Sequence, residues 1–355
     1  SRWTGRCAKR PSRCWRWRAE RCREAEGIAG SRRPTAPAPR IPAWTALVYG
    51  TAQQYRRIMT AHPFEEAAAP PARNACAPVV QRRVESVREA VILCGGAGTR
   101  IRALFPDLPK ALVPLAGRPF LEWQLEWLAA AGVRRVVLAA GYRADRLAAW
   151  RDAWARRPNA AALTIEMVVE PRPLGTGGAL RHAAGHMEGE TVLALNGDSL
   201  APRLDFHALE AEWRFFSKAW KKVRPSLPSL GTVGAADPPA LETRGAALAA
   251  IPMEDAGRFG TVEFGPADRV TAFREKAACV AGWVNAGVYL IDWGLLRALP
   301  PDIPFSLEND LFPALAQAGA LLAVRSEPPL LDIGTPEGRA TAERALTGGA
   351  HFERR

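Results

Sequence analysis

The sequence predicts an α/β protein with a Rossmann-like mixed, mostly parallel sheet and helices on both of its faces. From residue 85 onward, short apolar runs alternate with amphipathic segments of helical period. Three of these runs end in unusual polar turns, which read CGGAGTR, EPRPLGTGG and NGD. Alternation of strand, turn and helix is typical of parallel sheets, which bind ligands at the carboxyl ends of their strands.

The first expected strand is residues 89–94, EAVILC, an apolar run that ends at two glycines. The spacing then predicts a helix over 119–132, where large apolar residues recur every three or four positions and Gly132 provides a stop. Residues 133–142 form an apolar run and predict a second strand. Residues 144–157 predict the helix that follows it.

Two more apolar runs predict the third and fourth strands, at residues 163–170 and 191–198. A helix is expected at 204–213, and a strand with a turn is expected within 245–264. Residues 337–346 predict the final helix.

Charge and composition divide the chain into a basic leader and a neutral body. Of the 355 residues, 48% are hydrophobic, which suffices for one large or two ordinary domains. Residues 1–84 hold 17 Lys and Arg against 5 Asp and Glu, a net charge of +12, whereas residues 85–355 hold 31 of each sign. No uninterrupted apolar run of about 18 residues occurs, so the sequence predicts no membrane-spanning helix. We expect a mostly disordered leader at 1–84, one domain at 85–346 and a tail at 347–355.

The leader mixes Arg, Trp and Cys with Pro- and Ala-rich pieces and follows no steady period. An RNA-binding arm, a metal site and a targeting segment are alternatives to an appended extension that is not native. Cys7, Cys14 and Cys22 lack the close pairing of metal-binding cysteines, and no continuous apolar segment indicates secretion. We favour the extension, so nucleic acid is not an expected partner.

The turn after the first strand combines glycines with cations. Three glycines in four positions let the backbone approach a bulky anion and direct N–H groups toward it. Arg100 and Lys110 follow within the next residues and would offset phosphate charge. The spacing matches neither the P-loop nor GxGxxG, so the turn alone indicates a phosphate site without naming the reaction.

The segment GGAGTRIRALFPDLPKALVPLAGRPF resembles the opening of the sugar-1-phosphate nucleotidyltransferases, whose signature is GGxGTR followed by PKP. Here Ala111 replaces the last proline of that triplet and leaves the lysine in place. The resemblance extends over residues 88–346, with further motifs in the family's order. These are PLGTGGA at 173–179, NGD at 196–198, FGTV at 259–262, EK at 275–276, NAG at 285–287 and LDIGTP at 331–336.

The resemblance implies a Mg²⁺-dependent reaction between a nucleoside triphosphate and a sugar 1-phosphate, with Arg100, Lys110, Asp198 and Lys276 as catalytic residues. It implies a nucleotide site made by Leu93, Gly95, Gly96, Gly98, Thr99, Arg100, Lys110, Gly175, Thr176, Gly177 and Gly178. It implies a sugar-phosphate site made by Gly260, Glu275, Lys276 and Asn285, and Asp198 and Asp332 as metal ligands.

Each of these residues also has a purely structural interpretation. Asp198 and Asp332 are residue types that cap helices or close turns, Glu275 and Lys276 could form a solvated pair, and Asn285 could satisfy a buried turn. Residues 214–244 fit the family poorly and are expected to form a surface insertion; their aromatic and basic residues also suit a membrane-surface or partner helix.

PFSLENDLFPALA and the spacing of GTRIRALFPDLPK resemble the D-glycero-D-manno-heptose 1-phosphate guanylyltransferases most, which favours GTP with a heptose or mannose 1-phosphate. The alternative is a non-catalytic sugar-nucleotide-binding or regulatory subunit on the same fold. We expect a cytoplasmic protein, because the substrates are cytosolic metabolites, with no membrane partner. A homo-oligomer stays open.

Overall fold

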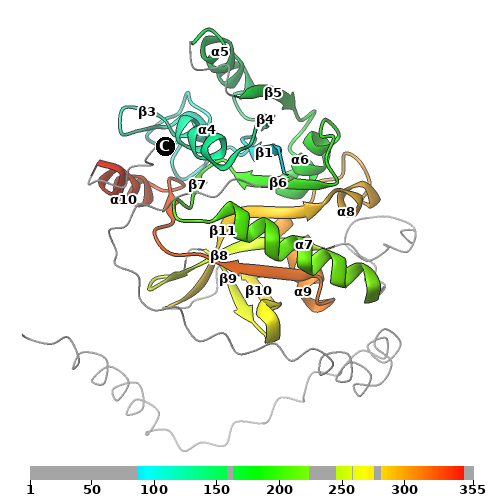
Figure 1. Cartoon of the computed structure of the whole chain (residues 1–355). Coiled ribbons are helices and arrows are strands. Elements are labelled where there is room, and N and C mark those ends of the chain that lie inside the picture. The colour runs from blue at the N-terminus through cyan, green and yellow to red at the C-terminus, as the bar shows by residue number, and fades with distance from the viewer. Residues whose placement is uncertain (1–86, 158–162, 224–244, 258, 276–280, 348–355) are drawn as a thin grey trace, which may run out of the picture. The chain divides into compact units, whose positions relative to one another are not determined.

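The computed structural model describes residues 87–157, 163–223, 245–257, 259–275 and 281–347, and the structural statements below concern these residues. The predicted leader and residues 348–355 lie outside them (Figure 1). No helix in these ranges is long and apolar enough to cross a membrane.

One half of the main sheet is parallel, as the alternating pattern predicts. It consists of β1 (Glu89–Leu93), β4 (Arg135–Ala140), β5 (Thr164–Val169) and β6 (Thr191–Asn196). These strands lie in the order β6-β1-β4-β5, and all three pairings are parallel. Consecutive residues of β1, β4 and β6 are buried, because other elements cover both faces of the sheet here.

The other half of the sheet is largely antiparallel. It contains β8 (Ala246–Met253), β9 (Gly260–Phe264), β10 (Val270–Glu275), β11 (Gly282–Asp292) and β12 (Leu321–Arg325). The long strand β11 joins the halves, since it pairs antiparallel with β6, β8 and β9. The described sheet has nine strands and is mixed, so the predicted fold class is confirmed.

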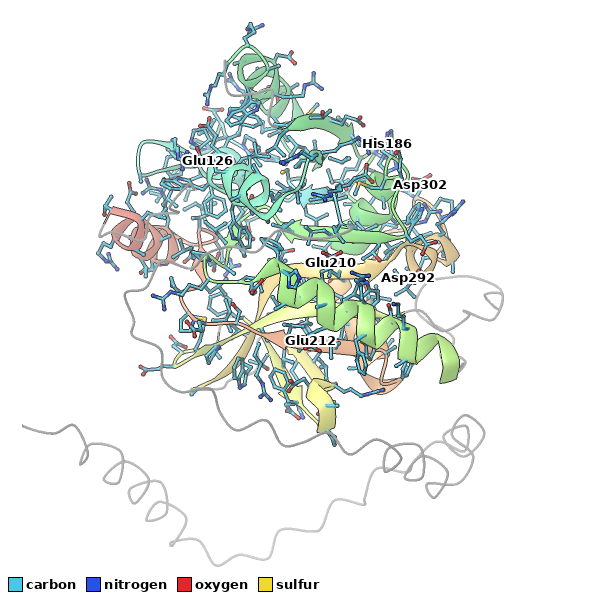
Figure 2. All side chains as sticks on the ribbon, viewed as in Figure 1. Glu126, His186, Glu210, Glu212, Asp292 and Asp302 are labelled. Atoms are coloured by element: carbon cyan, nitrogen blue, oxygen red, sulfur yellow. The ribbon has the colours of Figure 1, made fainter. Side chains whose placement is uncertain are left out.

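Helices flank this sheet (Figure 1). They are α4 (Phe120–Ala131), α5 (Ala144–Trp154), α6 (Gly175–Ala184), α7 (Phe206–Val223), α8 (Trp293–Ala298), α9 (Phe312–Gln317) and α10 (Pro336–Thr347). α6 packs on β1 and β4, whereas α7 packs on β8 and β12. Gly132 ends α4 with a left-handed φ of 98°, as its position predicted, and Asp292, labelled in Figure 2, caps α8 by accepting a hydrogen bond from Gly294 N.

Short elements complete the fold and carry several residues of interest. They are the 3₁₀ turns η1 (Lys110–Leu112) and η3 (Pro266–Asp268), the π-helical turn η4 (Leu307–Leu311), and the two-residue strands β2 (Pro114–Leu115), β3 (Arg118–Pro119), β7 (Ser199–Leu200) and β13 (Leu331–Asp332). β13 pairs with β7 and thereby brings the end of the chain to the end of β6.

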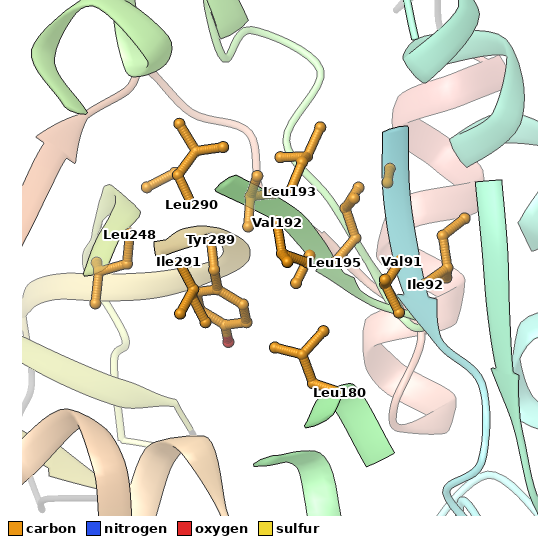
Figure 3. Packing of buried hydrophobic residues seen from close by; sticks show 14 of the residues in the cluster. Val91, Ile92, Leu180, Val192, Leu193, Leu195, Leu248, Tyr289, Leu290 and Ile291 are labelled. Carbon is orange, nitrogen blue, oxygen red and sulfur yellow. The ribbon is translucent and has the colours of Figure 1, made fainter. Parts of the chain in front are cut away.

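The core is continuous across the two halves of the sheet. Figure 3 shows Leu180 of α6, Ile92 of β1, Leu195 of β6 and Tyr289 of β11 in one cluster of buried side chains. Tyr289 is fully buried although it carries a hydroxyl group, so its polar atom needs partners inside the protein.

Helix α7 extends into the expected surface insertion at 214–244 and ends at residue 223. Within this part of the helix, Phe216 and Trp220 are buried beside Arg269, whose guanidinium lies 5.5 and 5.1 Å from their ring centroids, whereas Phe215 and Lys218 are exposed. The spacing of Trp213, Phe216 and Trp220 is helical and puts them on one face. Residues 224–244 lie outside the described residues, so the surface insertion stays a prediction.

Candidate functional site

The glycine-rich loop lies at the carboxyl end of β1, where the parallel arrangement predicts a ligand. Leu93 ends β1 and accepts a backbone hydrogen bond from Gly197 at the end of β6, 3.1 Å away. Gly98 has a φ of +54°, which favours glycine, and a Cβ there would lie 3.3 Å from the Cβ of Lys110. Residues 96, 97, 99 and 100 are exposed, so the loop is open to a ligand.

Lys110 links the glycine-rich loop to the end of β6. Its Nζ forms a close ion pair with Oδ2 of Asp198. Burial lowers the pKa of Lys110 from its ordinary 10.5 to about 8; attraction from Asp332 opposes this shift, and repulsion from Arg100 adds to it. The two predicted catalytic cations and the two predicted metal ligands are therefore neighbours.

Asp332 reaches this cluster through the β7–β13 pairing. It pairs with Ser199, and the next residue, Ile333, donates its backbone N–H to the carbonyl of Asp198 at 3.0 Å. A Cβ on Gly334 would lie 2.8 Å from Oδ1 of Asp332 and 2.9 Å from Nζ of Lys110. The glycine at 334 therefore leaves room for the lysine to approach both carboxylates.

The two carboxylates suit a magnesium ion whose coordination shell is completed by oxygens of a substrate. Magnesium in nucleotide sites usually takes one or two carboxylates, water and phosphate oxygens. Asp198 and Asp332 supply two carboxylates, and no group of three or more His, Cys, Asp or Glu residues gathers within the described ranges. The residues fit a metal shared with a polyphosphate better than an ion held by the protein alone.

Residues 173–179 form the beginning of a helix and not a free loop. The structure places Gly175 to Gly178 in the first turn of α6, which the sequence did not predict because glycine is a poor helix former. The turn is held by Phe305, whose carbonyl accepts hydrogen bonds from the backbone N–H groups of Gly177 and Gly178 at 3.0 and 3.3 Å. Thr176 donates its hydroxyl to Oε2 of Glu308 at 2.6 Å.

Gly175→Ala is expected to destabilise the protein by about 2–4 kcal/mol. Gly175 has a φ of +71°, and an added Cβ would lie 2.5 Å from the carbonyl oxygen of Phe305. Thermal unfolding measures the effect as a Tm lower by several degrees. Gly185→Ala at the other end of α6 is the control, because Gly185 has a φ of −58°. Equal Tm values for the two variants would contradict the strain at Gly175.

The predicted sugar-phosphate residues lie on three adjacent strands. Gly260 of β9 pairs with Glu275 of β10, and Thr261 pairs with Val284 of β11, next to Asn285. Asn285 accepts a hydrogen bond from the backbone N–H of Gly287 and donates its amide to the hydroxyl of Tyr289 at 2.8 Å. Lys276 lies outside the described residues.

Two glutamates at the site were missed by the sequence analysis. Glu170 follows β5, and its carboxylate approaches so closely that a Cβ on Gly95 would lie 2.7 Å from Oε1 and one on Gly141 only 2.2 Å. Glu308 belongs to η4 and contacts Thr176 and Tyr289. Asp198 was selected because it is an acidic residue at the end of a strand. The same criterion would have selected Glu170, which follows β5. The partners of Glu308 are distant in sequence, so no local pattern indicates them.

A parallel half-sheet whose strand ends carry a glycine-rich loop, two cations and two carboxylates is the arrangement expected of an α/β protein that binds phosphorylated ligands. Residues 90–223 match the family of MobA-like NTP transferase domains. The relatives that follow are sugar-1-phosphate guanylyltransferases, in agreement with the family that the motifs of this chain resemble.

The relatives are guanylyltransferases. The mannose-1-phosphate guanylyltransferase of Mycobacterium tuberculosis is 33% identical over 269 residues, which cover 74% of this chain and 65% of that protein. The D-glycero-alpha-D-manno-heptose 1-phosphate guanylyltransferase of Campylobacter jejuni is 28% identical over 250 residues, 70% of this chain and 96% of that protein. This chain thus spans just under two thirds of the first relative and nearly all of the second.

A solved structure shows the same fold. HddC of Yersinia pseudotuberculosis matches 73% of this chain and 100% of its own length, with a TM-score of 0.56 and 25% identity. The same protein complexed with GMP-PN matches with a TM-score of 0.55 and 26% identity.

Proposed function

We propose that this protein transfers the GMP group of GTP to a heptose or mannose 1-phosphate and releases pyrophosphate. The observation that carries the proposal is the charged cluster near the ends of β1 and β6, where Lys110 pairs with Asp198 and interacts electrostatically with Asp332 and Arg100. Cations next to carboxylates suit a reaction that joins two polyanions through a metal. The guanylyltransferase relatives and the GMP-PN complex of HddC support GTP as the donor.

In the proposed reaction, a phosphate oxygen of the sugar 1-phosphate attacks the α-phosphorus of GTP. The bond between the α-phosphorus and the oxygen bridging to the β-phosphorus breaks, and its electron pair leaves with pyrophosphate. The nucleophile is already an anion, so no general base is needed. The protein contributes mainly by positioning the substrates and neutralising charge, and the exposed loop after β1 would hold the triphosphate with backbone N–H groups.

The charged residues have separate roles in this proposal. Arg100 and Lys110 bind the triphosphate, and Lys276 and Asn285 bind the sugar phosphate. Asp198 and Asp332 would hold magnesium, which would supply positive charge that neutralises the phosphates. Lys110 also pairs with Asp198, so the lysine and a metal would share this carboxylate.

Pyrophosphate release tests the function directly. Purified full-length protein with magnesium is assayed with GTP, dTTP, UTP, CTP and ATP, each crossed with heptose, mannose and glucose 1-phosphates. We expect release with GTP and a heptose or mannose phosphate. A folded protein that is silent with every pair, yet binds a sugar nucleotide, would support the alternative of a non-catalytic subunit. The retained charged cluster favours the enzyme over that alternative.

Glu170 suits the recognition of guanine in this proposal. It lies between the loop after β1 and the start of α6, where Oε2 accepts a hydrogen bond from Leu174 N at 3.0 Å. Among the described residues nothing donates to its Oε1, and no Lys or Arg pairs with it. Guanine presents adjacent N1–H and N2–H donors that a carboxylate can accept, whereas uracil and thymine present one donor between two acceptors.

Glu170→Gln is therefore expected to lower kcat/KM for GTP by about 5- to 150-fold and to lower its preference over UTP and dTTP. The amide replaces one acceptor with a donor and cannot accept both guanine protons. Glu166→Gln on β5 is the matched control, since Glu166 pairs with Arg135. An unchanged ratio of GTP to UTP rates in Glu170→Gln would refute the assignment.

We place this reaction in the cytoplasm, where nucleoside triphosphates and sugar phosphates are made.

A further inference from the structure

A partly buried hydrogen-bond network connects the two substrate regions of the proposed site. Its centre is Glu308, which extends from the π-helical turn η4. Oε2 of Glu308 accepts the hydroxyl of Thr176 at 2.6 Å and that of Ser306 at 3.0 Å. Oε1 accepts the hydroxyl of Tyr289 at 3.4 Å. The carboxylate therefore receives three hydroxyl donors, one from α6, one from β11 and one from Ser306 directly before η4.

The network continues from Tyr289 to the sugar side of the site. The tyrosine hydroxyl accepts the amide of Asn285 at 2.8 Å and the amide of Asn196 at 3.2 Å. Asn285 lies in β11 where the pairing with β8 shifts register, while Asn196 ends β6 two residues before Asp198. A single carboxylate thus connects the first turn of α6, the irregular part of β11 at Asn285 and the strand end that precedes Asp198.

The charge of Glu308 sets the direction of every bond in this network. A carboxylate only accepts hydrogen bonds, so the hydroxyl of Tyr289 must donate to it. The lone pairs of that hydroxyl then accept from the two asparagine amides, which turns Oδ1 of Asn285 toward the backbone N–H of Gly287 at 2.9 Å. A neutral amide at position 308 would present a donor to at least one of these hydroxyl groups.

The packing around the network leaves little room for other arrangements. Tyr289 is fully buried, and burial together with the charge of Glu308 raises its pKa well above 10, so its hydroxyl stays protonated. Gly287 has a φ of +72°, and a Cβ there would lie 3.0 Å from the Cβ of Asn196. Ser306 caps η4 by accepting from the N–H groups of Glu308 and Asn309.

We propose that Glu308 is a positioning residue that orients Thr176 for the nucleotide and Asn285 for the sugar phosphate, so that its charge couples the two substrate sites. Glu308 itself touches neither substrate. This inference rests on the proposed function, because it takes the first turn of α6 as the nucleotide side and the part of β11 at Asn285 as the sugar side.

The test measures KM for each substrate in two variants of the full chain. Glu308→Gln keeps the shape of the side chain and is expected to raise KM for GTP and for the sugar 1-phosphate by about tenfold each, because hydrogen bonds to the charge are lost on both sides. Tyr289→Phe keeps the ring in the core and removes the hydroxyl that links Glu308 to Asn285 and Asn196, while the bond between Glu308 and Thr176 stays. It is expected to raise KM for the sugar 1-phosphate alone, and it provides the test if Glu308→Gln does not fold.

Asp310→Asn separates positioning from simple loosening of η4. Asp310 accepts a hydrogen bond from Ser306 N at 2.7 Å and thereby stabilises the same turn. The Asp310→Asn variant is therefore expected to have a lower Tm and unchanged KM values. If the wild type is active and Glu308→Gln changes only Tm, the coupling is refuted and the proposed function stands. A wild type that is folded but inactive refutes the proposed function, and this inference with it.

Discussion

Asp198→Asn is expected to lower kcat/KM by on the order of 10³-fold, the largest loss among single substitutions at this site. In the proposed reaction, Asp198 is one of two carboxylates that hold the metal on the α-phosphate. The amide keeps the size of the side chain but loses its negative charge, and it also releases Lys110 from its ion pair. Pyrophosphate release with saturating magnesium measures the loss, and binding of Mn²⁺ in the presence of GTP gives a readout that does not depend on turnover.

Asp205→Asn is the matched control for this experiment. Asp205 lies in the following loop, where its Oδ1 accepts hydrogen bonds from the backbone N–H groups of His207 and Ala208 at 2.9 and 3.1 Å. Because an asparagine oxygen accepts these hydrogen bonds about as well as a carboxylate, this variant is expected to leave both the stability and the activity nearly unchanged. Should Asp198→Asn retain wild-type activity and Mn²⁺ binding, Asp198 would be a structural residue of the turn only.

Lys110→Ala is expected to lower kcat/KM for GTP by on the order of 10²- to 10³-fold, because the triphosphate loses a buried cation. The wild type is also expected to lose kcat/KM for GTP as the pH rises above about 8. The sign follows from the pKa of Lys110, which burial lowers to about 8, so the free protein loses this positive charge above that pH. The logarithm of kcat/KM should then fall by about one per pH unit.

Lys110→Arg separates the charge of this side chain from its shape. The guanidinium stays protonated in this pH range, so the decline near pH 8 should vanish, although its different geometry should reduce the rate at neutral pH. The measurement is a pH profile of kcat/KM for GTP in both proteins, in buffers of constant ionic strength. Identical profiles in the two proteins would show that another group causes the decline.

The parallel half of the fold could be predicted from the sequence because its signals are local. Strands β1, β4, β5 and β6 appear as short apolar runs, and Gly132 ends its helix where the pattern indicates. The antiparallel half could not be predicted in the same way. β11 pairs with β6, β8 and β9. The local sequence of β11 does not indicate which strands it pairs with.

The first turn of α6 shows where local propensity misled the analysis. α6 begins with three glycines among its first four residues, a composition typical of a loop, but hydrogen bonds to the carbonyl of Phe305 hold the turn. Here tertiary contacts override the preference of the segment.

The sequence also located most of the candidate site, since Arg100, Lys110, Asp198 and Asp332 belong to motifs and the structure brings them together. Their chemical roles stay predictions until the substitutions above are measured. Glu170 and Glu308 were missed for a different reason. Glu308 acquires its importance from Thr176 and Tyr289, which reach it only when α6, β11 and η4 have packed.

The pairing of β13 with β7 has a consequence for how the protein is made. Asp332 joins Asp198 only after a chain segment of more than a hundred residues has closed into a loop, and such distant contacts form late because their closure entropy is high. During synthesis, the sheet strands β1 to β6 emerge from the ribosome well before residue 332 does. A partly made chain therefore has the glycine-rich loop and Asp198 without Asp332, and we expect the proposed metal site to be complete only after residue 332 has been made.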